Sequence, residues 1–307
     1  AGMAPDLDVF IRSSTDPILF LEYHRQFTHS LFFIPFGALM VTFFLYPLFR
    51  KTMSLKTVYL ASFLGYATHG LIDACTSYGT LLFWPFSNER VTWNNISIVD
   101  PLFTIPILIL TGTAIKTRKR LFSFFAIGWV AFYLSLGFVQ YERALSALNE
   151  LAYSRGHNPE RLTLKPSFGN LILWKSIYQH EENFYIDAIR TVRSSTWCRG
   201  ESVGIFDYQR HLPNLNKDSQ QKKDIERFRW FSQDYLGFDK EKNLVTDIRY
   251  SMIPNQIAPM WGLVIDDQRD INEHAIWWAS RGLEQGQLDV FKQMLIGKNC
   301  RDSDLAL

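Results

Sequence analysis

Two stretches of the sequence lack any charged side chain over a length that would cross a lipid bilayer. Ser30–Phe49 covers 20 residues and Leu121–Tyr141 covers 21. A membrane-spanning helix needs about 20 mostly apolar residues, whereas a helix of a soluble protein usually keeps a polar stripe. The two stretches therefore predict membrane spans, with buried helices of a soluble four-helix bundle as the alternative.

Two further candidates lie between these stretches. Thr57–Ile72 contains no charged residue, and Ile96–Ile115 is apolar except for Asp100. Counting all four, we expect a multi-pass α-helical membrane domain at residues 1–145. The sequence opens at Ala1 rather than at a methionine, from which we expect a further membrane helix to precede it.

The links between the predicted spans set the expected orientation. Two of the links are basic; they contain Arg50, Lys51 and Lys56, and Lys116, Arg118, Lys119 and Arg120. Positive charge marks the cytoplasmic side of a membrane protein. We therefore expect residues 1–29, residues 74–95 and everything after Tyr141 to lie on the extracytoplasmic side of the cell (inner) membrane.

The residues after Tyr141 are rich in charge and contain no apolar stretch of membrane length. Their patterning predicts a small soluble α+β domain at residues 146–307. The expected extended segments are Arg161–Leu173, Asn183–Val192, Gly200–Tyr208, Leu244–Ile253, Gln256–Ile265 and His274–Ser280, and the expected helices are Asp218–Tyr235 and Leu288–Ile296. Cys198 and Cys300 are predicted to be unpaired thiols, with a disulfide between them as the alternative. A net charge of +2 gives no field that would bind nucleic acid, so no nucleic-acid partner is expected.

Acidic and histidine side chains gather in the first 75 residues. They are Asp6 and Asp8 in P-D-L-D, His24 and His29 in H-R-Q-F-T-H-S, and His69 and Asp73 in H-G-L-I-D. His69 and Asp73 are four residues apart, so a helix places them on one face, where a metal ion can bridge them. The alternatives are a structural hydrogen bond between these two side chains and, for the whole set, a coincidence of scattered polar residues.

The predicted topology brings all six side chains to one side of the membrane. Six nitrogen and oxygen ligands without a thiolate suit one zinc ion, or a two-metal site of zinc, manganese or iron. Two metals would suit phosphoester hydrolysis, and Arg25 is expected to hold a phosphate oxygen. Residues 78–87 follow with Phe83, Trp84 and Phe86, which we predict to be interfacial anchors; lining an entrance for an acyl chain is the alternative.

These motifs, in this order, resemble a known family. P-D-L-D, H-R-x-x-T-H-S, H-x-x-x-D and G-T-L-L-F-W-P-F-S are similar to the YdjM-type inner-membrane metal-dependent hydrolases, also called the YbcI or DUF457 group. The resemblance covers roughly residues 4–140 and implies a metal-dependent hydrolase. A distant similarity of that family to zinc-dependent phospholipase C and P1 nuclease implies a phosphoester substrate. Carried over motif by motif, the implied metal ligands are Asp6, Asp8, His24, His29, His69 and Asp73.

The sequence thus predicts a membrane-bound metal-dependent hydrolase of a phosphoester in a phospholipid or lipid-linked substrate. We expect a divalent metal, zinc before manganese or iron, with Asp8, Arg25 and Asp73 as catalytic residues. The expected partners are the lipid bilayer and that substrate. The alternatives are a non-catalytic membrane scaffold with a structural metal and a partner-binding outer domain, and a transporter.

Overall fold

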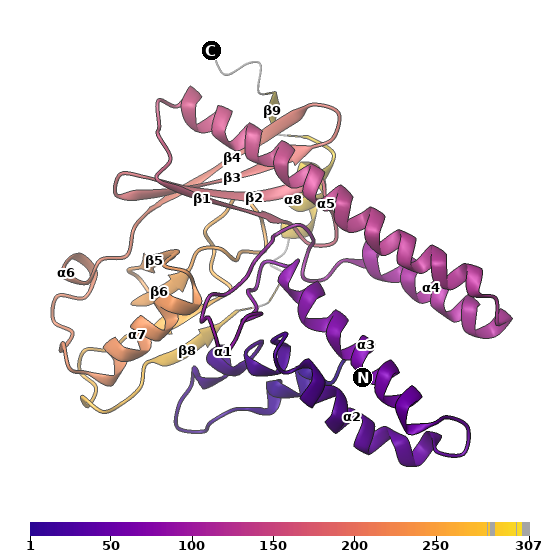
Figure 1. Ribbon diagram of the computed structural model, residues 1–307. Helices are drawn as coiled ribbons and strands as arrows, with labels where there is room; N and C mark the ends of the chain where they lie inside the picture. Colours follow the sequence, from indigo (N-terminus) through magenta and orange to yellow (C-terminus); the bar gives the residue numbers. More distant parts are fainter. Residues whose placement is uncertain (281, 283–285, 299, 303–307) are drawn as a thin grey trace. The chain divides into compact units, whose positions relative to one another are not determined.

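A computed structural model of the chain describes residues 1–280, 282, 286–298 and 300–302 (Figure 1). By its internal contacts the chain divides into two compact units, which are described separately. The N-terminal unit contains Ala1–Trp93, Asn216–Asp234 and Gln268–Ile276, and the sheet unit contains Asn94–Leu215, Tyr235–Asp267 and Trp277–Leu307. Neither unit follows the predicted boundary between residues 145 and 146.

The N-terminal unit is helical. Its elements are the 3-10 helices η1 (Pro5–Phe10) and η2 (Phe27–His29), and the α-helices α1 (Leu19–Tyr23), α2 (Ile34–Phe49), α3 (Leu55–Ala74) and α7 (Gln220–Phe231). Ser54 begins α3 as an N-cap, since its side chain accepts a hydrogen bond from the backbone N–H of Thr57. The two helices α2 and α3 pack against each other, and Gly37 of α2 leaves room for the ring of Tyr66 of α3.

A distant part of the chain completes this unit. The guanidinium of Arg227 in α7 lies 2.8 Å from the carboxylate of Asp16 and 2.5 Å from that of Glu22. The N-cap of the same helix is Ser219, whose side chain accepts a hydrogen bond from the N–H of Lys222. The unit is therefore held together by residues about 200 positions apart in the sequence.

The sheet unit begins with an antiparallel helical hairpin and continues into two sheets. The helices are α4 (Pro101–Thr117), α5 (Arg120–Ser154), α6 (Tyr208–His211) and α8 (Gln287–Leu295). The first sheet has antiparallel neighbours in the order β1 (Arg161–Pro166), β2 (Leu173–His180), β3 (Asn183–Thr191), β4 (Ser195–Gly204) and β9 (Arg301–Asp302). The second sheet has the order β5 (Leu236–Asp239), β6 (Leu244–Asp247), β7 (Trp261–Val264) and β8 (Ile276–Ala279). The predicted C-terminal α+β domain is thus present. The single extended segment predicted at Arg161–Leu173 is wrong, because the structure has β1 there only up to Pro166 and a separate strand β2 from Leu173 to His180.

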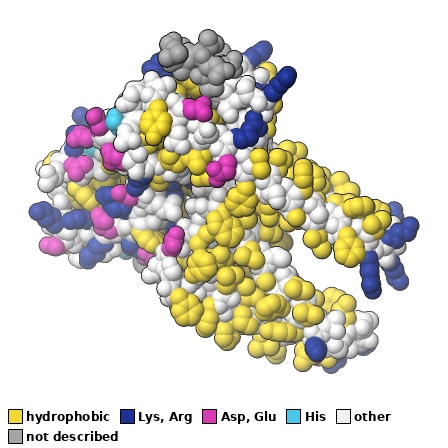
Figure 2. All heavy atoms as spheres, turned by 45° about the horizontal axis from the view of Figure 1, so that its top comes forward, with side chains coloured by type: hydrophobic (Ala, Val, Ile, Leu, Met, Phe, Trp, Pro, Cys, Tyr) yellow, Lys and Arg dark blue, Asp and Glu magenta, His cyan; other side chains and the backbone are white. Residues whose placement is uncertain are grey.

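The long helix α5 has two different halves. Its C-terminal half packs Ala144, Leu148 and Ala152 onto Leu164 and Trp174 of the first sheet. Its N-terminal half is apolar and mostly exposed, and Figure 2 shows hydrophobic side chains gathered over the helical hairpins. A helix that is apolar on its open surface is suited to lipid contact.

The predicted multi-pass membrane domain is wrong. By length and composition, α5 is the one helix among the described residues that is apolar enough to span a membrane, or one of two if the segments Leu19–His29 and Ile34–Phe49 count as a single span bent by 87°. The 16 residues of α2 and the 17 of α4 reach only about 25 Å, short of the ~30 Å hydrocarbon core. The remaining helix, α3, is long enough but carries polar side chains, including His69 and Asp73.

The structure also corrects the prediction of unpaired thiols. Cys198 of β4 and Cys300 form a disulfide, while Cys75 is a buried free cysteine. The disulfide closes a loop of the chain across 102 sequence positions. A crosslink of that span constrains the unfolded chain strongly.

Candidate metal centre

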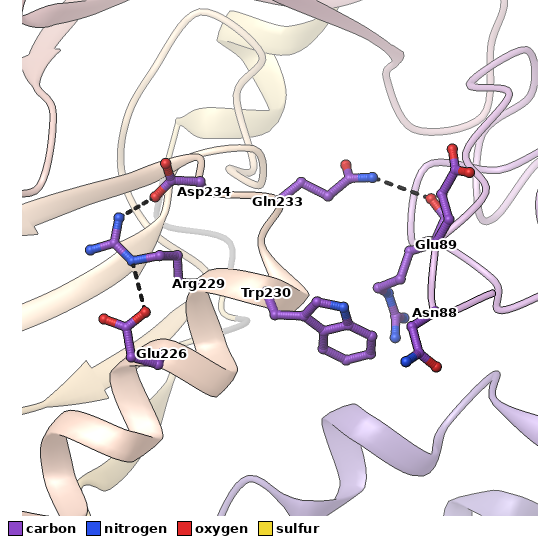
Figure 3. A pocket seen from close by; sticks show the side chains of 8 residues that line it. Asn88, Glu89, Glu226, Arg229, Trp230, Gln233 and Asp234 are labelled. Carbon is purple, nitrogen blue, oxygen red and sulfur yellow. Dashed lines mark hydrogen bonds and ion pairs between the residues drawn. The ribbon is translucent and has the colours of Figure 1, made fainter.

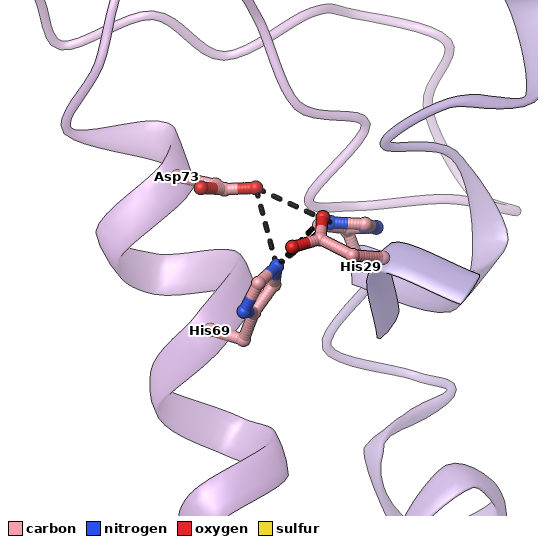
Figure 4. A group of neighbouring side chains, drawn as sticks. His29, His69 and Asp73 are labelled. Atoms are coloured by element: carbon pink, nitrogen blue, oxygen red, sulfur yellow. Dashed lines mark hydrogen bonds and ion pairs between the residues drawn. The ribbon is translucent and has the colours of Figure 1, made fainter. Parts of the chain in front are cut away.

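Four side chains from three elements converge on one point of the N-terminal unit. Asp6 comes from η1, His29 from η2, and His69 and Asp73 from α3; one ligand atom of each lies within 4.8 Å of the other three. Figure 4 shows His29, His69 and Asp73 pointing toward one another. This group has the ligand types and the spacing to hold a metal ion.

The separations between the ligand atoms are short. The two Nε2 atoms of His29 and His69 are 3.1 Å apart. His29 Nε2 lies 3.2 Å from Asp73 Oδ2 and 3.5 Å from Asp6 Oδ1, and His69 Nε2 lies 3.2 Å from Asp6 Oδ1 and 3.5 Å from Asp73 Oδ2. Two imidazole nitrogens and two carboxylate oxygens therefore face a common centre.

The buried Oδ2 of Asp73 supports the fit to a cation. It has no hydrogen-bond partner of suitable geometry, although Arg25 Nε and both histidine Nε2 atoms lie within 3.5 Å of it. A buried carboxylate oxygen without a hydrogen bond is costly. A bound cation would satisfy this oxygen and both imidazole nitrogens together.

Glycine is required where η2 meets α3. A Cβ atom at Gly70 would lie 2.2 Å from the carbonyl oxygen of His29, so only a residue without a side chain allows this approach. The hydroxyl of Tyr66, one turn earlier, donates a hydrogen bond to the carbonyl of Thr28. Sequence reasoning missed both residues, although a glycine inside a helix, beside a histidine, is a signal of close packing.

Asp8 lies beside the four-residue group. Its buried carboxylate is 2.8 Å from His24 Nδ1 and 3.1 Å from His29 Nδ1, and it accepts hydrogen bonds from the Thr28 hydroxyl and the Arg25 backbone N–H. A carboxylate on Nδ1 fixes the tautomer of a histidine so that Nε2 can bind a metal. Asp8 is therefore placed to orient His29.

The two acids of P-D-L-D differ in their surroundings. The side chain of Asp6 is 45% exposed, whereas that of Asp8 is fully buried. Hydrogen bonds from His29 and His69 hold the pKa of Asp6 well below its usual value. Burial alone would raise the pKa of Asp8, but its hydrogen bonds with His24, His29 and Thr28 outweigh that effect and lower the pKa.

Arg25 adds positive charge next to the cluster. Its Nε lies 3.1 Å from Asp73 Oδ2, a terminal nitrogen donates to the Thr76 hydroxyl at 2.9 Å, and its guanidinium lies over the ring of Tyr78. The backbone of Arg25 has a φ of 63°, a conformation uncommon outside glycine. The predicted phosphate contact of Arg25 stays a prediction.

The aromatic loop after α3, residues 78–87, is hydrogen-bonded to the segment that contains Arg25 and η2. The N–H of Leu81 donates to the carbonyl of Arg25, and the carbonyl of Leu82 accepts from the N–H of Leu31. Phe83 and Phe86 are exposed, as expected for the predicted anchors. The loop thus fixes the backbone that carries Arg25 and η2.

A second cavity of the same unit has different chemistry. It has a volume of about 450 Å³ and lies between residues 88–90 and the end of α7 (Figure 3). Arg229 pairs there with Glu226 and with Asp234, and the Gln233 side chain donates to the backbone carbonyl of Arg90. Because these polar groups already contact one another, the metal cluster is the stronger candidate site.

We expect Asp8→Asn to weaken metal binding without removing a ligand of the four-residue group. The amide would no longer act as an anionic acceptor for His29 Nδ1, and a change of this kind costs roughly 10–100-fold in metal affinity. Titration of the metal-free protein with zinc, followed by calorimetry, measures the change. Unchanged affinity would show that Asp8 does not orient His29.

Of the six ligands predicted from the sequence, the structure brings four together. Asp6, His29, His69 and Asp73 form the group, while Asp8 and His24 contact each other at its edge. Among the three predicted catalytic residues, Asp73 lies in the group, and Asp8 and Arg25 contact it. The structure thus distinguishes four candidate metal ligands from two residues, Asp8 and His24, that lie beside them.

Comparison with known proteins points to one family. A 104-residue stretch is 29% identical to YfhP, an uncharacterized protein of Bacillus subtilis (strain 168), and covers 34% of this chain and 31% of that protein. The chain thus matches about a third of the length of this curated relative. No solved structure matches the chain. Residues 1–144 match the model of the YdjM inner membrane protein family, which confirms the resemblance seen in the motifs.

Proposed function

We propose that this membrane protein is a metal-dependent hydrolase of a phosphoester, with a phospholipid or lipid-linked phosphate as its substrate. The observation that carries the proposal is the cluster of Asp6, His29, His69 and Asp73. Zinc binds imidazole nitrogen and carboxylate oxygen at about 2.0–2.2 Å, so the edges of a regular tetrahedron around it measure about 3.3–3.6 Å. The five nitrogen–nitrogen and nitrogen–oxygen separations of 3.1–3.5 Å are close to those edges, which supports zinc, while manganese and iron accept the same ligands.

Each neighbouring side chain has a role in this proposal. A metal held at the cluster would supply Lewis-acid activation for phosphoester cleavage. Asp8 orients His29, and Asp73 sits between the two histidines and Arg25. Arg25 would bind a phosphate oxygen through its guanidinium, and Asp8 or Asp73 would accept a proton.

A second candidate function is supported by the number of ligands. Four protein ligands close a structural metal site, whereas a catalytic site keeps one position open. The exposure of Asp6 supports the hydrolase: its side chain is 45% exposed, against 0% for His29 and 14% for His69. An exposed ligand on a six-residue 3-10 helix is the one that a substrate can displace, and this favours the hydrolase over the scaffold.

Two features of the sheet unit support an extracytoplasmic location for that unit. Disulfides such as Cys198–Cys300 persist in oxidising compartments. The basic residues Lys116, Arg118, Lys119 and Arg120 are exposed where α4 connects to α5, at the end of α5 opposite its contact with the sheet, and basic residues favour the cytoplasmic side. We propose that α5 anchors the chain in the membrane with the sheets outside; the side of the metal site stays a prediction.

Metal removal tests the proposed activity. Purified protein in detergent is expected to contain one equivalent of metal and to hydrolyse bis-p-nitrophenyl phosphate or a phospholipid in mixed micelles. Stripping with a chelator should reduce the rate to that of buffer, and adding back zinc, manganese or iron should restore it. Full activity without metal would refute the hydrolase mechanism. One bound metal with no hydrolysis of either substrate would instead favour the scaffold.

A further inference from the structure

An apolar groove runs beside the metal cluster in the N-terminal unit. It has a volume of about 280 Å³ and lies between η1, η2, α2 and Tyr66 of α3. Its apolar lining includes Leu7, Ile11, Phe33, Met40, Val41 and Phe44. The volume is close to the lower end of the roughly 300–1,000 Å³ found for ligand pockets, which suits one alkyl chain.

The polar side chains that line the groove lie next to one another: the Thr28 hydroxyl donates to the Asp8 carboxylate, and the Tyr66 hydroxyl donates to the Thr28 carbonyl. Asp8 and Thr28 are the polar residues there, next to the Tyr66 ring. Asp8 lies 3.1 Å from His29 Nδ1, and the opposite nitrogen of the same ring, Nε2, belongs to the metal cluster. The groove is therefore mostly apolar, and its polar side chains are one residue, His29, away from the other candidate ligands.

The open side of the groove is apolar as well. Leu7 is 62% exposed and Phe44 is 71% exposed. Beyond the groove, Phe43 and Leu48 of α2 are each 75% exposed. Because this segment matches the model of an inner membrane protein family, lipid is the apolar material available to cover such a surface.

We propose that this groove binds one acyl chain of a lipid substrate and so places its phosphoester at the metal cluster. The inference rests on the proposed function and adds the site that selects a lipid over a soluble phosphoester. It differs from the acyl-chain entrance that is the alternative interpretation of Phe83, Trp84 and Phe86, because those residues lie outside the lining of the groove. Binding of the chain here would position the head group by proximity.

Photo-crosslinking tests the site without requiring hydrolysis. The full chain is reconstituted in phosphatidylethanolamine vesicles that contain phosphatidylglycerol with a diazirine in one acyl chain. The label is expected on peptides that contain Leu7, Ile11 or residues 40–44. Val41→Trp, which fills the groove, should reduce this label about tenfold, and Ile11→Trp on the opposite wall should do the same. Leu48→Trp, on the same helix but outside the groove, is the matched control and should keep the label.

Kinetics separates a substrate chain from a lipid that merely coats the protein. With a long-chain phospholipid, Val41→Trp should raise KM about tenfold and change kcat less than about twofold. A loss of label without any change in KM would overturn the substrate assignment, and so would equal label along all of α2 in both variants. Label in the groove without any hydrolysis would refute the proposed function and leave the acyl-chain site standing. A metal content equal to that of the parent protein would show that the N-terminal unit of each variant is folded.

Discussion

His69→Ala is expected to abolish metal binding and phosphoester hydrolysis together. His69 Nε2 makes three contacts of 3.1–3.5 Å within the cluster, to His29, Asp6 and Asp73. Removing a direct ligand should cost more than the roughly 10–100-fold in metal affinity that the loss of an orienting neighbour costs. Elemental analysis and the hydrolysis assay measure the two losses.

The fold should survive this substitution. The His69 side chain is 14% exposed, so its removal opens no closed cavity in the core, and circular dichroism should remain that of the parent. His180→Ala, in a strand of the sheet unit, is the matched control and should keep both metal and activity. A folded His69→Ala protein with full metal content and full hydrolysis would remove the basis of the proposed function.

Gly70→Ala is expected to damage the same site without changing any candidate ligand. The added methyl group would start 2.2 Å from the His29 carbonyl oxygen, so η2 must move away from α3 by more than about 1 Å to reach an ordinary contact of roughly 3.5 Å. A displacement of this size at a catalytic group costs about 100-fold in rate. Overpacking of a well-packed contact also costs roughly 1–3 kcal/mol of folding free energy.

A second helical glycine provides the control for this experiment. A Cβ atom at Gly112 of α4 would meet nothing within 4 Å. Alanine is favoured over glycine inside a helix by about 0.8–1 kcal/mol, so Gly112→Ala should be neutral or stabilising. Thermal unfolding and zinc titration of both variants make the comparison. Wild-type metal affinity in Gly70→Ala would mean that η2 need not contact α3 so closely.

The pairing of His69 with Asp73 is the part of the site that the sequence predicts best. Their spacing of four residues is local, and α3 places them on one face as expected. The convergence of Asp6 and His29 on that pair depends on contacts between different elements, for which the predicted membrane topology and the family motifs were the sequence signals. The structure has this convergence because η1 packs against α3 and η2 contacts α3 at Tyr66 and Gly70.

The different surroundings of Asp6 and Asp8 could not be predicted from P-D-L-D alone. In an extended segment two positions apart share a face, and both acids would point to one metal. The segment instead forms the 3-10 helix η1, where residues two apart point about 120° away from each other. Asp6 therefore turns toward His69, and Asp8 toward His24.

The error in fold class has a similar physical origin. The prediction counted uncharged residues, but a span requires continuous helix. Pro35 lies in the first turn of α2 and Pro101 opens α4, and proline favours the start of a helix. The residues before them, although apolar, form turns and loops, so the helices are shorter than the apolar stretches. In α5 no proline interrupts the apolar stretch, and the helix covers all of Leu121–Tyr141.

The ion pairs of Arg227 with Asp16 and Glu22 have a consequence for biosynthesis. At about 5–20 residues per second, the ribosome makes α7 about 10–40 seconds after it makes η1. During that interval Asp16 and Glu22 have no Arg227 to pair with, because α7 is encoded more than 200 codons later. The segment that carries Asp16 and Glu22 therefore lacks these ion pairs until most of the protein has been synthesised.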